Sequence, residues 1–446
     1  MAKSRHLNTK WFVQVFIMVA VCFTIYMFDK VDSTQTSSTE QPPLNSCCIS
    51  EQFSVINEID NKIFKHIIKD DQRNFAFSAY GITQAIKAMS VLLGDNNKHK
   101  VLLYILHDDK KCGKINQKES VLKKGIDIKK SITSYTKKRH IMVPPRPPKK
   151  IHPQEMNEAT RIWIDKKSVI DPKIMNCYQD IVKKIKIAGD ADRACNTINN
   201  WVSKNTMGMI TDLVQPDSIY EDSKIVVTNT LTFKGKWKEP FQKERTALMN
   251  FKASRYRNGE EMIKVKTMIG TMKANYYHGD KVEIAELPYY GDKYSMVLIL
   301  PVKQSQDENK YGTREPSTMT NHEILHILRS PGMMLKNTKL QVFLPKFKIS
   351  SKFQLREILT SLGFNTIFNS QLEAVLNHKD LRFTEVLHRV VVEVNEEGTK
   401  ASAGSAGLAS RSFPMTFKVD RSFQFMIRNI EDDVVVFHGY VEKPEW

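Results

Sequence analysis

The sequence predicts an α+β fold with large, mainly antiparallel β-sheets, and three observations lead to this class. The chain has 446 residues, of which 41% are hydrophobic and 26% charged, which is typical of a globular protein and excludes a disordered polyampholyte or a collagen-like fibre. Strand-like apolar runs are frequent from residue 225 onward and are separated by gaps of hairpin length. Shorter stretches with apolar residues at helical spacing alternate with these runs, which indicates helices packed against sheets.

The amino terminus has the features of a targeting segment. Four basic residues precede an almost unbroken apolar run over residues 11–28. This run is long for a signal-peptide core and about the minimum for a spanning helix, so two interpretations remain open. Small residues at Val31 and Ser33 fit cleavage, which would make residues 1–33 a signal peptide and the protein secreted and extracellular. In the alternative, the segment is a retained signal anchor and the protein is a type II membrane protein.

The next segments connect the targeting region to the folded body. Residues 34–52 are rich in polar residues and Pro, which predicts a flexible polar extension, with folded structure starting near Phe53. Residues 74–78 form a short apolar run that predicts a strand. Residues 82–93 carry apolar side chains at helical spacing and end at Gly94, which predicts a buried helix.

Most of the positive charge is concentrated in one stretch. The formal net charge is +18, which predicts attraction to a polyanion. Residues 110–150 contain fourteen Lys and Arg but only two acidic residues, so we treat them as a basic insertion. An amphipathic helix is predicted over residues 121–139, with Lys123, Lys130 and Lys137 on the face opposite its apolar side. The Pro-rich run at 144–148 ends this helix and predicts an extended surface excursion.

The carboxyl-terminal half supplies the predicted sheets. The strand-like runs are residues 225–227, 294–300, 340–344, 390–394, 423–427 and 434–437.

Five cysteines lie outside the targeting segment, an odd number and too few for a dense disulfide framework in so long a chain. No C-x-x-C pair is present, so the sequence gives no sign of a zinc ribbon or a redox motif. Two interpretations stay open: a disulfide between Cys112 and one of the vicinal pair Cys47 and Cys48, which would tether the polar extension to the folded body, or unpaired thiols.

One enzyme motif is present. His322, Glu323 and His326 match H-E-x-x-H, in which two imidazoles bind zinc and the glutamate acts as general base. However, Thr320 lies three residues before Glu323, which is the pattern of a helix capping box, so helix-start chemistry explains Glu323 without a metal. A third ligand at the short metzincin spacing is absent, as are the common hydrolase, dinucleotide and NTP signatures. We therefore expect no metal, no catalytic residues and no enzyme activity, with a zinc protease kept as an alternative.

The most unusual segment is residues 396–414, which follow the predicted strand at 390–394. In an extended conformation its alternate positions from Thr399 to Ala409 point to one side, and all of them are small. Composition alone would also fit a flexible linker. A linker, however, needs neither this alternation in size nor the single Arg411 near its far end. These features favour a segment that exists as an exposed loop and can also insert into a sheet as a strand.

From about residue 53 to residue 446 the chain resembles the serpins. The marks are NFAFS at 74–78, INNWV at 198–202, TMGMI at 206–210, the stretch from Asn229 to FKGKW at 233–237, LPY at 287–289, SMVLILP at 295–301, LPKF at 344–347, EEGT at 396–399 and FHGYV at 437–441. The resemblance implies one serpin domain over residues 53–446, with three β-sheets, about nine helices and residues 396–414 as an exposed reactive-centre loop.

The resemblance also implies roles for individual residues. Ser78, Asn229 and His388 fall where the family has its shutter hydrogen bonds beneath the main sheet, and Trp237 falls at the breach, where the loop enters the sheet. The residues that match the hinge of the loop are Glu396, Glu397, Gly398, Thr399, Ala401 and Ala403.

Three positions depart from the family pattern. The second shutter serine is replaced by Gly81 and the usual proline by Ala79, which would loosen the gate between the strands. The acidic residue usual after the hinge threonine is Lys400, which faces outward by the alternation.

The resemblance implies suicide inhibition of a serine protease by loop cleavage and insertion, a process that releases stored strain. The reactive bond is expected between Arg411 and Ser412, which would attract a trypsin-like enzyme, and the alternative bond is between Ser412 and Phe413. A non-inhibitory serpin that acts as a binding or carrier protein is the alternative function.

We expect a monomer that binds no nucleic acid and needs no cofactor, although a sulfated, heparin-like glycosaminoglycan is a candidate activator. The basic helix falls where heparin-activated serpins keep theirs, and a solvated lysine face is the alternative reading of the same pattern. The candidate polyanion-binding residues are Lys123, Lys124, Lys130, Lys137, Lys138 and Arg139.

Overall fold

The computed structural model describes residues 45–69, 74–98, 101, 154–219, 223–255, 259–302, 319–397 and 414–446. The chain divides into two compact units, residues 1–47 and 48–446, and the fold below is that of the second unit. The targeting segment at 1–33, the basic insertion at 110–150 and most of the loop at 396–414 lie outside the described residues. Within the described part, no helix combines the length and the apolar character needed to cross a membrane.

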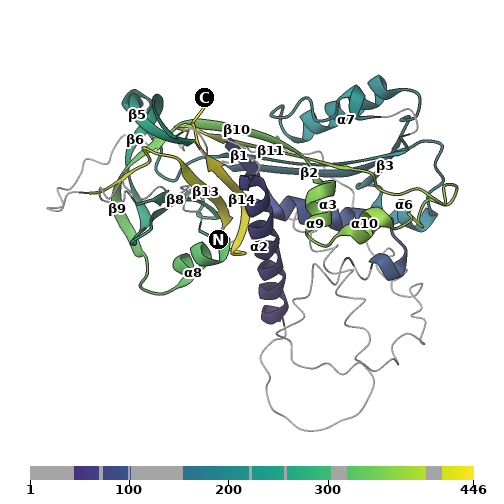
Figure 1. Ribbon diagram of the computed structural model, residues 1–446, viewed down its shortest axis with the longest axis horizontal. Helices are drawn as coiled ribbons and strands as arrows, with labels where there is room; N and C mark the ends of the chain where they lie inside the picture. Colours follow the sequence, from purple (N-terminus) through teal and green to yellow (C-terminus); the bar gives the residue numbers. More distant parts are fainter. Residues whose placement is uncertain are drawn as a thin grey trace, which may run out of the picture. The chain divides into compact units, whose positions relative to one another are not determined.

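Helices and strands alternate along the described chain, as the sequence predicts (Figure 1). The α-helices are α2 Asn45–Lys69, α3 Ala79–Ser90, α6 Pro172–Tyr178, α7 Ala191–Asn205, α8 Asn321–Arg329, α9 Leu355–Ser361 and α10 Asn365–Asn369. The strands are β1 Asn74–Phe77, β2 Gln154–Asp165, β3 Val182–Ile185, β4 Ile225–Gly235, β5 Ala247–Arg255, β6 Gly259–His278, β7 Val282–Pro288, β8 Tyr294–Pro301, β9 Leu335–Pro345, β10 Phe347–Gln354, β11 Val386–Val394, β12 Met415–Lys418, β13 Phe423–Asn429 and β14 Val434–Val441.

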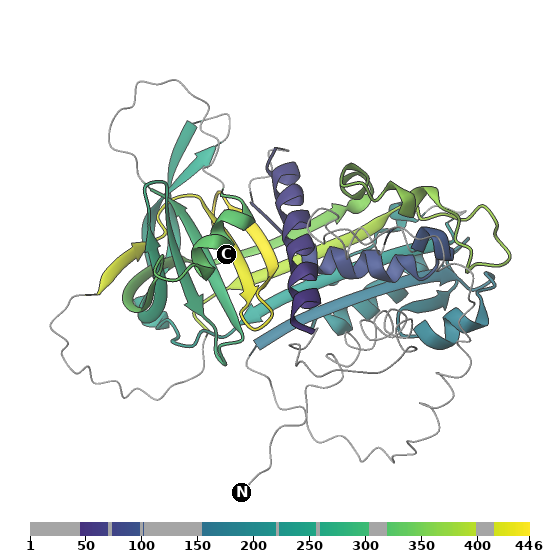
Figure 2. The same ribbon diagram turned by 90° about the horizontal axis from the view of Figure 1, so that it is seen from below.

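The five-stranded sheet has the order β10-β11-β4-β2-β3 and lies between two layers of helices. Figure 1 shows α7 over one face and α3, α9 and α10 over the other, and in Figure 2 α3 runs lengthwise along the strands. The strands carry apolar residues on both faces for this reason. In β11, Val386 packs in the core that contains α3, Val390 and Val392 pack against strands of the nine-stranded ladder, and Leu387 and Val391 pack with α7. The sheet is therefore buried on both sides along its centre.

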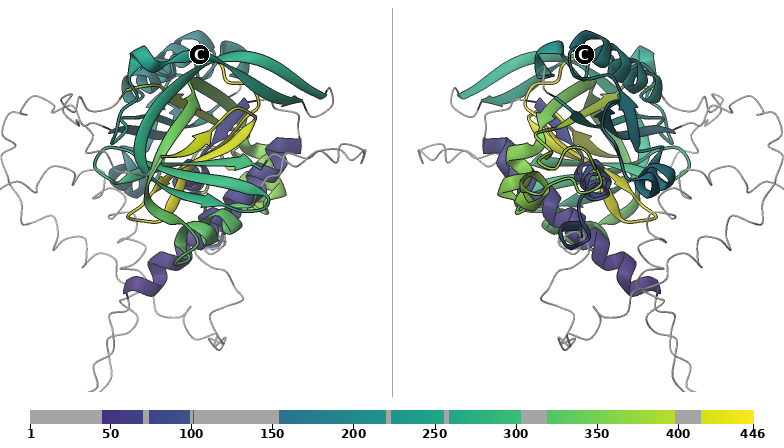
Figure 3. Two further views of the ribbon diagram at one scale, coloured as in Figure 1. Left: turned by 90° about the vertical axis from the view of Figure 1, so that its left-hand side faces the viewer. Right: turned by 90° about the vertical axis from the view of Figure 1, so that its right-hand side faces the viewer.

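The remaining strands form one continuous ladder of nine strands, with β5 paired to β6 beside the main path. Three separate sheets were expected, and the described hydrogen bonds join them into two. The long strand β6 explains this difference, because it pairs with β5 at one end, with β9 in its middle and with β7 at the other end. Figure 3 shows the β5–β6 hairpin projecting beyond the rest of this ladder.

One boundary differs from the sequence prediction. Helix α2 begins at Asn45, eight residues before Phe53, where we expected folded structure to start, so the segment 34–52 is not a flexible extension throughout. The physical reason is visible in the sequence. Ile56 and Ile63 are buried, and Ile49 and Phe53 precede them at the same helical spacing. The polar residues between them concealed this pattern.

Candidate functional site at the β4–β11 seam

The centre of the five-stranded sheet contains a pair of strands with an unusual arrangement. Strands β4 and β11 are parallel, with residue pairs from Val386↔Val227 to Glu393↔Lys234, while their outer neighbours β2 and β10 are antiparallel to them. We call this parallel pair the seam. The chain leaves β11 at Val394 and enters the segment 396–414, so a strand that turned back from there would run antiparallel to both β11 and β4. Its insertion would replace one parallel ladder with two antiparallel ones, which are slightly more stable per residue.

A single side-chain hydrogen bond crosses the middle of the seam. His388 Nδ1 lies 2.6 Å from Asn229 Oδ1, and both side chains are fully buried. The two residues are direct partners in the ladder. Adjacent strands lie about 4.8 Å apart, so a strand inserted between them would double their separation and break this bond. The contact therefore holds the seam closed at its middle, and the structure brings Asn229 and His388 together.

Burial sets the charge of His388. Desolvation lowers the pKa of its imidazole to about 3, against the opposing effect of Asn229, so the ring is neutral at physiological pH. A neutral imidazole donates through only one nitrogen. With Nδ1 bonded to Asn229, the second nitrogen Nε2 is buried without a partner.

Ser78 lies beneath the same sheet but has a different local role. Its hydroxyl accepts a hydrogen bond of 3.0 Å from the Gly81 backbone N–H and so caps α3. No bond from this hydroxyl to Asn229 or His388 is found among the described contacts. Gly81 allows α3 to lie close to the seam, because a Cβ there would be 2.1 Å from a methyl of Leu231 and 3.1 Å from Asn229 Oδ1. The replacement of the second serine by Gly81 is therefore a packing requirement of this chain.

Trp237 holds the backbone at the point where the loop leaves the sheet. Its indole Nε1–H donates to the Asn395 carbonyl at 2.8 Å, and its backbone N–H donates to the Glu397 carbonyl at 3.1 Å. The buried ring stacks on Tyr289, with the ring centroids 4.5 Å apart. Trp237 thus fixes the backbone just after the end of β11, and its role at the breach stays a prediction.

Glu396 is anchored at the same end of the seam. Its carboxylate, in a residue only 6% exposed, lies 2.9 Å from Lys346 Nζ and accepts a bond of 2.7 Å from the Thr246 hydroxyl. Burial alone would raise the pKa of this carboxylate, but the hydrogen bonds from Lys346 and Thr246 bring it below its usual range. Glu397 pairs more loosely, 3.3 Å from Lys234 Nζ. A cleft of about 230 Å³ opens beside these groups.

Sequence reasoning missed the partners of Glu396. Lys346 belongs to the LPKF motif that carried the family resemblance, so a signal was present, but nothing local indicated that a residue fifty positions away would meet it. Thr246 follows a short 3₁₀ turn, Lys243–Arg245, and had no distinguishing pattern.

The other candidate positions lie outside the described residues. They are Gly398, Thr399, Ala401, Ala403, Arg411, Ser412, Phe413, Lys123, Lys124, Lys130, Lys137, Lys138 and Arg139. Cys177 is exposed and Cys195 is buried, and both of these thiols are free.

The H-E-x-x-H segment is part of the scaffold. Glu323 is the second half of a capping box: its carboxylate accepts from the Thr320 hydroxyl at 2.7 Å and from the Thr320 N–H at 2.8 Å, which lowers its pKa. His322 and His326 are exposed, and the described residues contain no cluster of three metal-ligating side chains. The zinc-protease alternative therefore loses its general base to helix capping.

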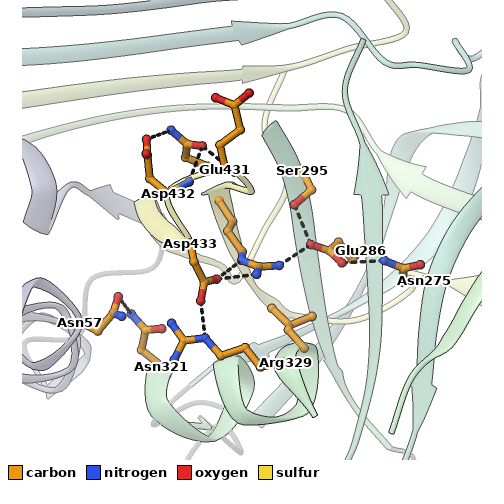
Figure 4. A network of polar contacts seen from close by, with 12 residues as sticks. Asn57, Asn275, Glu286, Ser295, Asn321, Arg329, Glu431, Asp432 and Asp433 are labelled. Carbon is orange, nitrogen blue, oxygen red and sulfur yellow. Dashed lines mark hydrogen bonds and ion pairs between the residues drawn. The ribbon is translucent and has the colours of Figure 1, made fainter. Parts of the chain in front are cut away.

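The same helix is tied to the nine-stranded ladder by a network of charges. In Figure 4, Arg329 at the end of α8 points to Asp433, and Glu286 lies between Ser295 and Asn275. Arg428 connects the two parts, because it bonds to Asp433 and lies 2.9 Å from Glu286. These contacts fix α8 against the nine-stranded ladder. The segment with the H-E-x-x-H pattern therefore has a structural role, and the candidate functional site is the seam.

Comparison with known proteins agrees with this architecture. Residues 55–444 match the family model described as serpin (serine protease inhibitor). A relative named serine protease inhibitor from Cyanea capillata is 32% identical over 298 residues, which cover 64% of this chain and 75% of that protein. A crystal structure of uncleaved ovalbumin superposes with a TM-score of 0.69 at 23% identity, covering 88% of this chain and all of the other. A structure of native protease nexin-1 with heparin gives a TM-score of 0.64 at 25% identity, covering 89% of this chain and all of the other.

Proposed function

The chain belongs to the serpin family, and from this premise we propose that it is a secreted inhibitor of a trypsin-like serine protease that works by inserting its cleaved loop into the seam. The observation that carries the proposal is the parallel β4–β11 pair, with the loop segment leaving directly from the end of β11. A sheet of this kind has one central position at which a strand formed by residues after 396 can add antiparallel to both neighbours.

In this proposal the catalytic groups are those of the protease, and this chain supplies the bond that is cut and the segment that inserts. The protease serine Oγ attacks the carbonyl carbon of Arg411, an ester forms between the two chains, and the bond to Ser412 breaks with that nitrogen leaving as an amine. The freed segment then inserts along the seam. Because β11 spans nine residues, complete insertion moves the ester by roughly 30 Å. We expect this displacement to disturb the arrangement of catalytic groups that would otherwise hydrolyse the ester, so that the two chains stay joined.

In this proposal, the contacts at residues 395–397 and in the middle of the seam oppose insertion before the loop is cut. Trp237 and the buried pair of Glu396 with Lys346 hold residues 395–397 at the end of the seam, while the Asn229–His388 bond keeps its middle closed. Small residues are required on the inserting face because the seam covers a close-packed core that includes Phe233 and Val392.

The first prediction is a covalent complex. We expect incubation with a trypsin-like protease to yield a species of the summed masses that survives boiling in detergent, together with a carboxyl-terminal fragment that begins at Ser412. Denaturing electrophoresis and mass spectrometry measure both. Parallel incubations with chymotrypsin- and elastase-like enzymes test the alternative bond after Ser412. Quantitative cleavage with no complex for any of the three enzymes would contradict inhibition and favour the binding or carrier function.

The second proposal concerns the basic insertion, whose predicted helix at 121–139 would bind a sulfated glycosaminoglycan as an activator. The heparin present in the similar protease nexin-1 structure supports this choice of ligand. Replacing Lys123, Lys130 and Lys137 by Glu should abolish retention on a heparin column at moderate salt and leave inhibition without heparin unchanged. Retention of the unaltered protein should fall steeply with salt, because polyanion binding releases condensed counterions. Equal retention of the variant and the unaltered protein would exclude this face as the polyanion site.

A further inference from the structure

A chain of hydrogen bonds extends from the seam lock across three strands. Asn229, whose Oδ1 faces His388, directs its Nδ2 to the Thr160 hydroxyl at 2.6 Å. That hydroxyl lies 3.0 Å from Glu158 Oε1. Thr160 is the ladder partner of Asn229 on β2, and Glu158 is two residues away on the same strand. We call these four residues the relay.

The end of the relay determines the direction of every bond in it. An ionised carboxylate only accepts hydrogen bonds, so the Thr160 O–H must donate to Glu158. The Thr160 oxygen is then left to accept from the Asn229 amide nitrogen, which turns Asn229 Oδ1 toward the seam. His388 must therefore carry its proton on Nδ1, and the partnerless Nε2 is an acceptor. Buried acceptors without partners are tolerated better than buried N–H groups without partners.

We propose that Glu158 is a positioning residue that, through Thr160, orients Asn229 for its hydrogen bond across the seam, and that protonation of Glu158 weakens this lock. The proposal rests on the proposed function, because the lock matters only if the seam opens to admit a strand.

Protonation removes the constraint on direction. A protonated carboxyl group can donate to Thr160, whose own proton is then free to reach Asn229 Oδ1. The amide of Asn229 would in that case turn its nitrogen toward His388, which would need the opposite tautomer and would bury an N–H without an acceptor. Both arrangements become accessible, so the closed seam loses the single well-oriented bond that it has when Glu158 is ionised.

The surroundings of Glu158 place this change near neutral pH. Burial raises the pKa of its carboxyl to about 7, against the opposing effects of the Thr160 hydrogen bond and the charge of Lys87 on α3. Tyr80, also on α3, faces the same region, and burial followed by the charge of Glu158 raises its pKa well above 10. His388 stays neutral, with a pKa of about 3. Among the described groups of the relay and its surroundings, Glu158 is therefore the one that titrates around pH 7.

The free energy of unfolding and the hydrogen bond across the seam should depend on pH in opposite directions. Because the pKa of Glu158 is raised in the folded chain, its contribution to the free energy of unfolding is fully present below pH 4.5 and is lost as the pH rises through 7. The lock has the opposite dependence, since it is strongest when Glu158 is ionised. Lowering the pH through 7 should therefore increase the contribution of Glu158 to the free energy of unfolding. The same change should weaken the bond across the seam and make the seam easier to open.

Strand insertion into the full-length chain tests this without any protease. The probe is a fluorescent peptide with the sequence of residues 398–411, and its rate of stable incorporation is measured between pH 5.5 and 8.5. We expect the rate to rise about fivefold as the pH falls through 7, the effect of losing roughly one buried hydrogen bond. In Glu158→Gln, a nearly isosteric side chain that does not titrate, the rate should be independent of pH.

Variants at Thr160 test whether Glu158 acts by orienting Asn229 through Thr160 or only through its charge. Thr160→Val interrupts the relay while Glu158 still titrates, so incorporation should be fast at every pH although unfolding remains pH-dependent. Thr160→Ser should restore the pH profile. Glu357→Gln, which removes an exposed carboxylate on α9, is the matched control and should behave as the unaltered protein. A flat profile in the unaltered protein, or the same profile in Thr160→Val, would overturn the proposal, and neither result depends on whether a protease is inhibited.

Discussion

Replacing Thr399 by Glu is expected to convert the protein from an inhibitor into a substrate. By the alternation of small residues, Thr399 faces the core when the loop inserts, at the end of the seam where Phe233, Val392 and Val394 are fully buried. A carboxylate placed there has no partner and must lose its hydration. The cost of several kcal/mol corresponds to a slowing of insertion by two or more orders of magnitude. Hydrolysis of the ester would then be faster than insertion. The gel should show cleaved chain in place of the complex, and the protease should keep its activity.

Lys400→Glu is the matched control for this substitution. It introduces the same side chain into the same segment, but at an alternate position that points to the opposite face of the sheet, at the end of the seam where Lys234 and Glu393 are only partly buried. Glu is preferred to Arg in both variants because it adds no new bond that a trypsin-like enzyme would cut. We expect Lys400→Glu to form the complex with the stoichiometry of the unaltered protein. If the two variants form equal amounts of complex, insertion with the predicted facing is wrong.

Local patterns in the sequence predicted much of the scaffold. The apolar runs that predicted strands at 225–227, 294–300 and 390–394 lie within β4, β8 and β11, and the capping box at Thr320 and Glu323 begins α8. Such features depend on side-chain periodicity and on hydrogen bonds between neighbours in the sequence, so the sequence contains them in full.

The contacts that control the seam depend on strand register, which the sequence does not state. Glu158, Asn229 and His388 come from three strands and meet only because β2, β4 and β11 pair in one register. A shift by one residue would turn each side chain to the opposite face. The family resemblance located Asn229 and His388, but Thr160 and Glu158 have no mark of their own in the sequence. The joined nine-stranded ladder was missed for a similar reason, because nothing in its composition shows that β6 serves three partners.

The measurement that tests the central claim most directly is the thermal stability of the chain after a single cut in the loop. The cut chain is prepared with limiting protease and isolated with its fragments still associated, and mass spectrometry confirms that the cut lies between residues 398 and 413. Insertion should change the five-stranded sheet into one of six strands and add about ten backbone hydrogen bonds. At about 1 kcal/mol each, in a chain of this size, that is a rise in Tm of roughly 10 °C.

The comparison is made by calorimetry on cut and uncut protein, with Thr399→Glu treated in the same way as the reference. The account predicts that the cut unaltered chain melts roughly 10 °C above the uncut chain, and that the gain is much smaller in Thr399→Glu. A cut chain that melts at or below the temperature of the uncut chain would show that the freed segment does not enter the seam between β4 and β11.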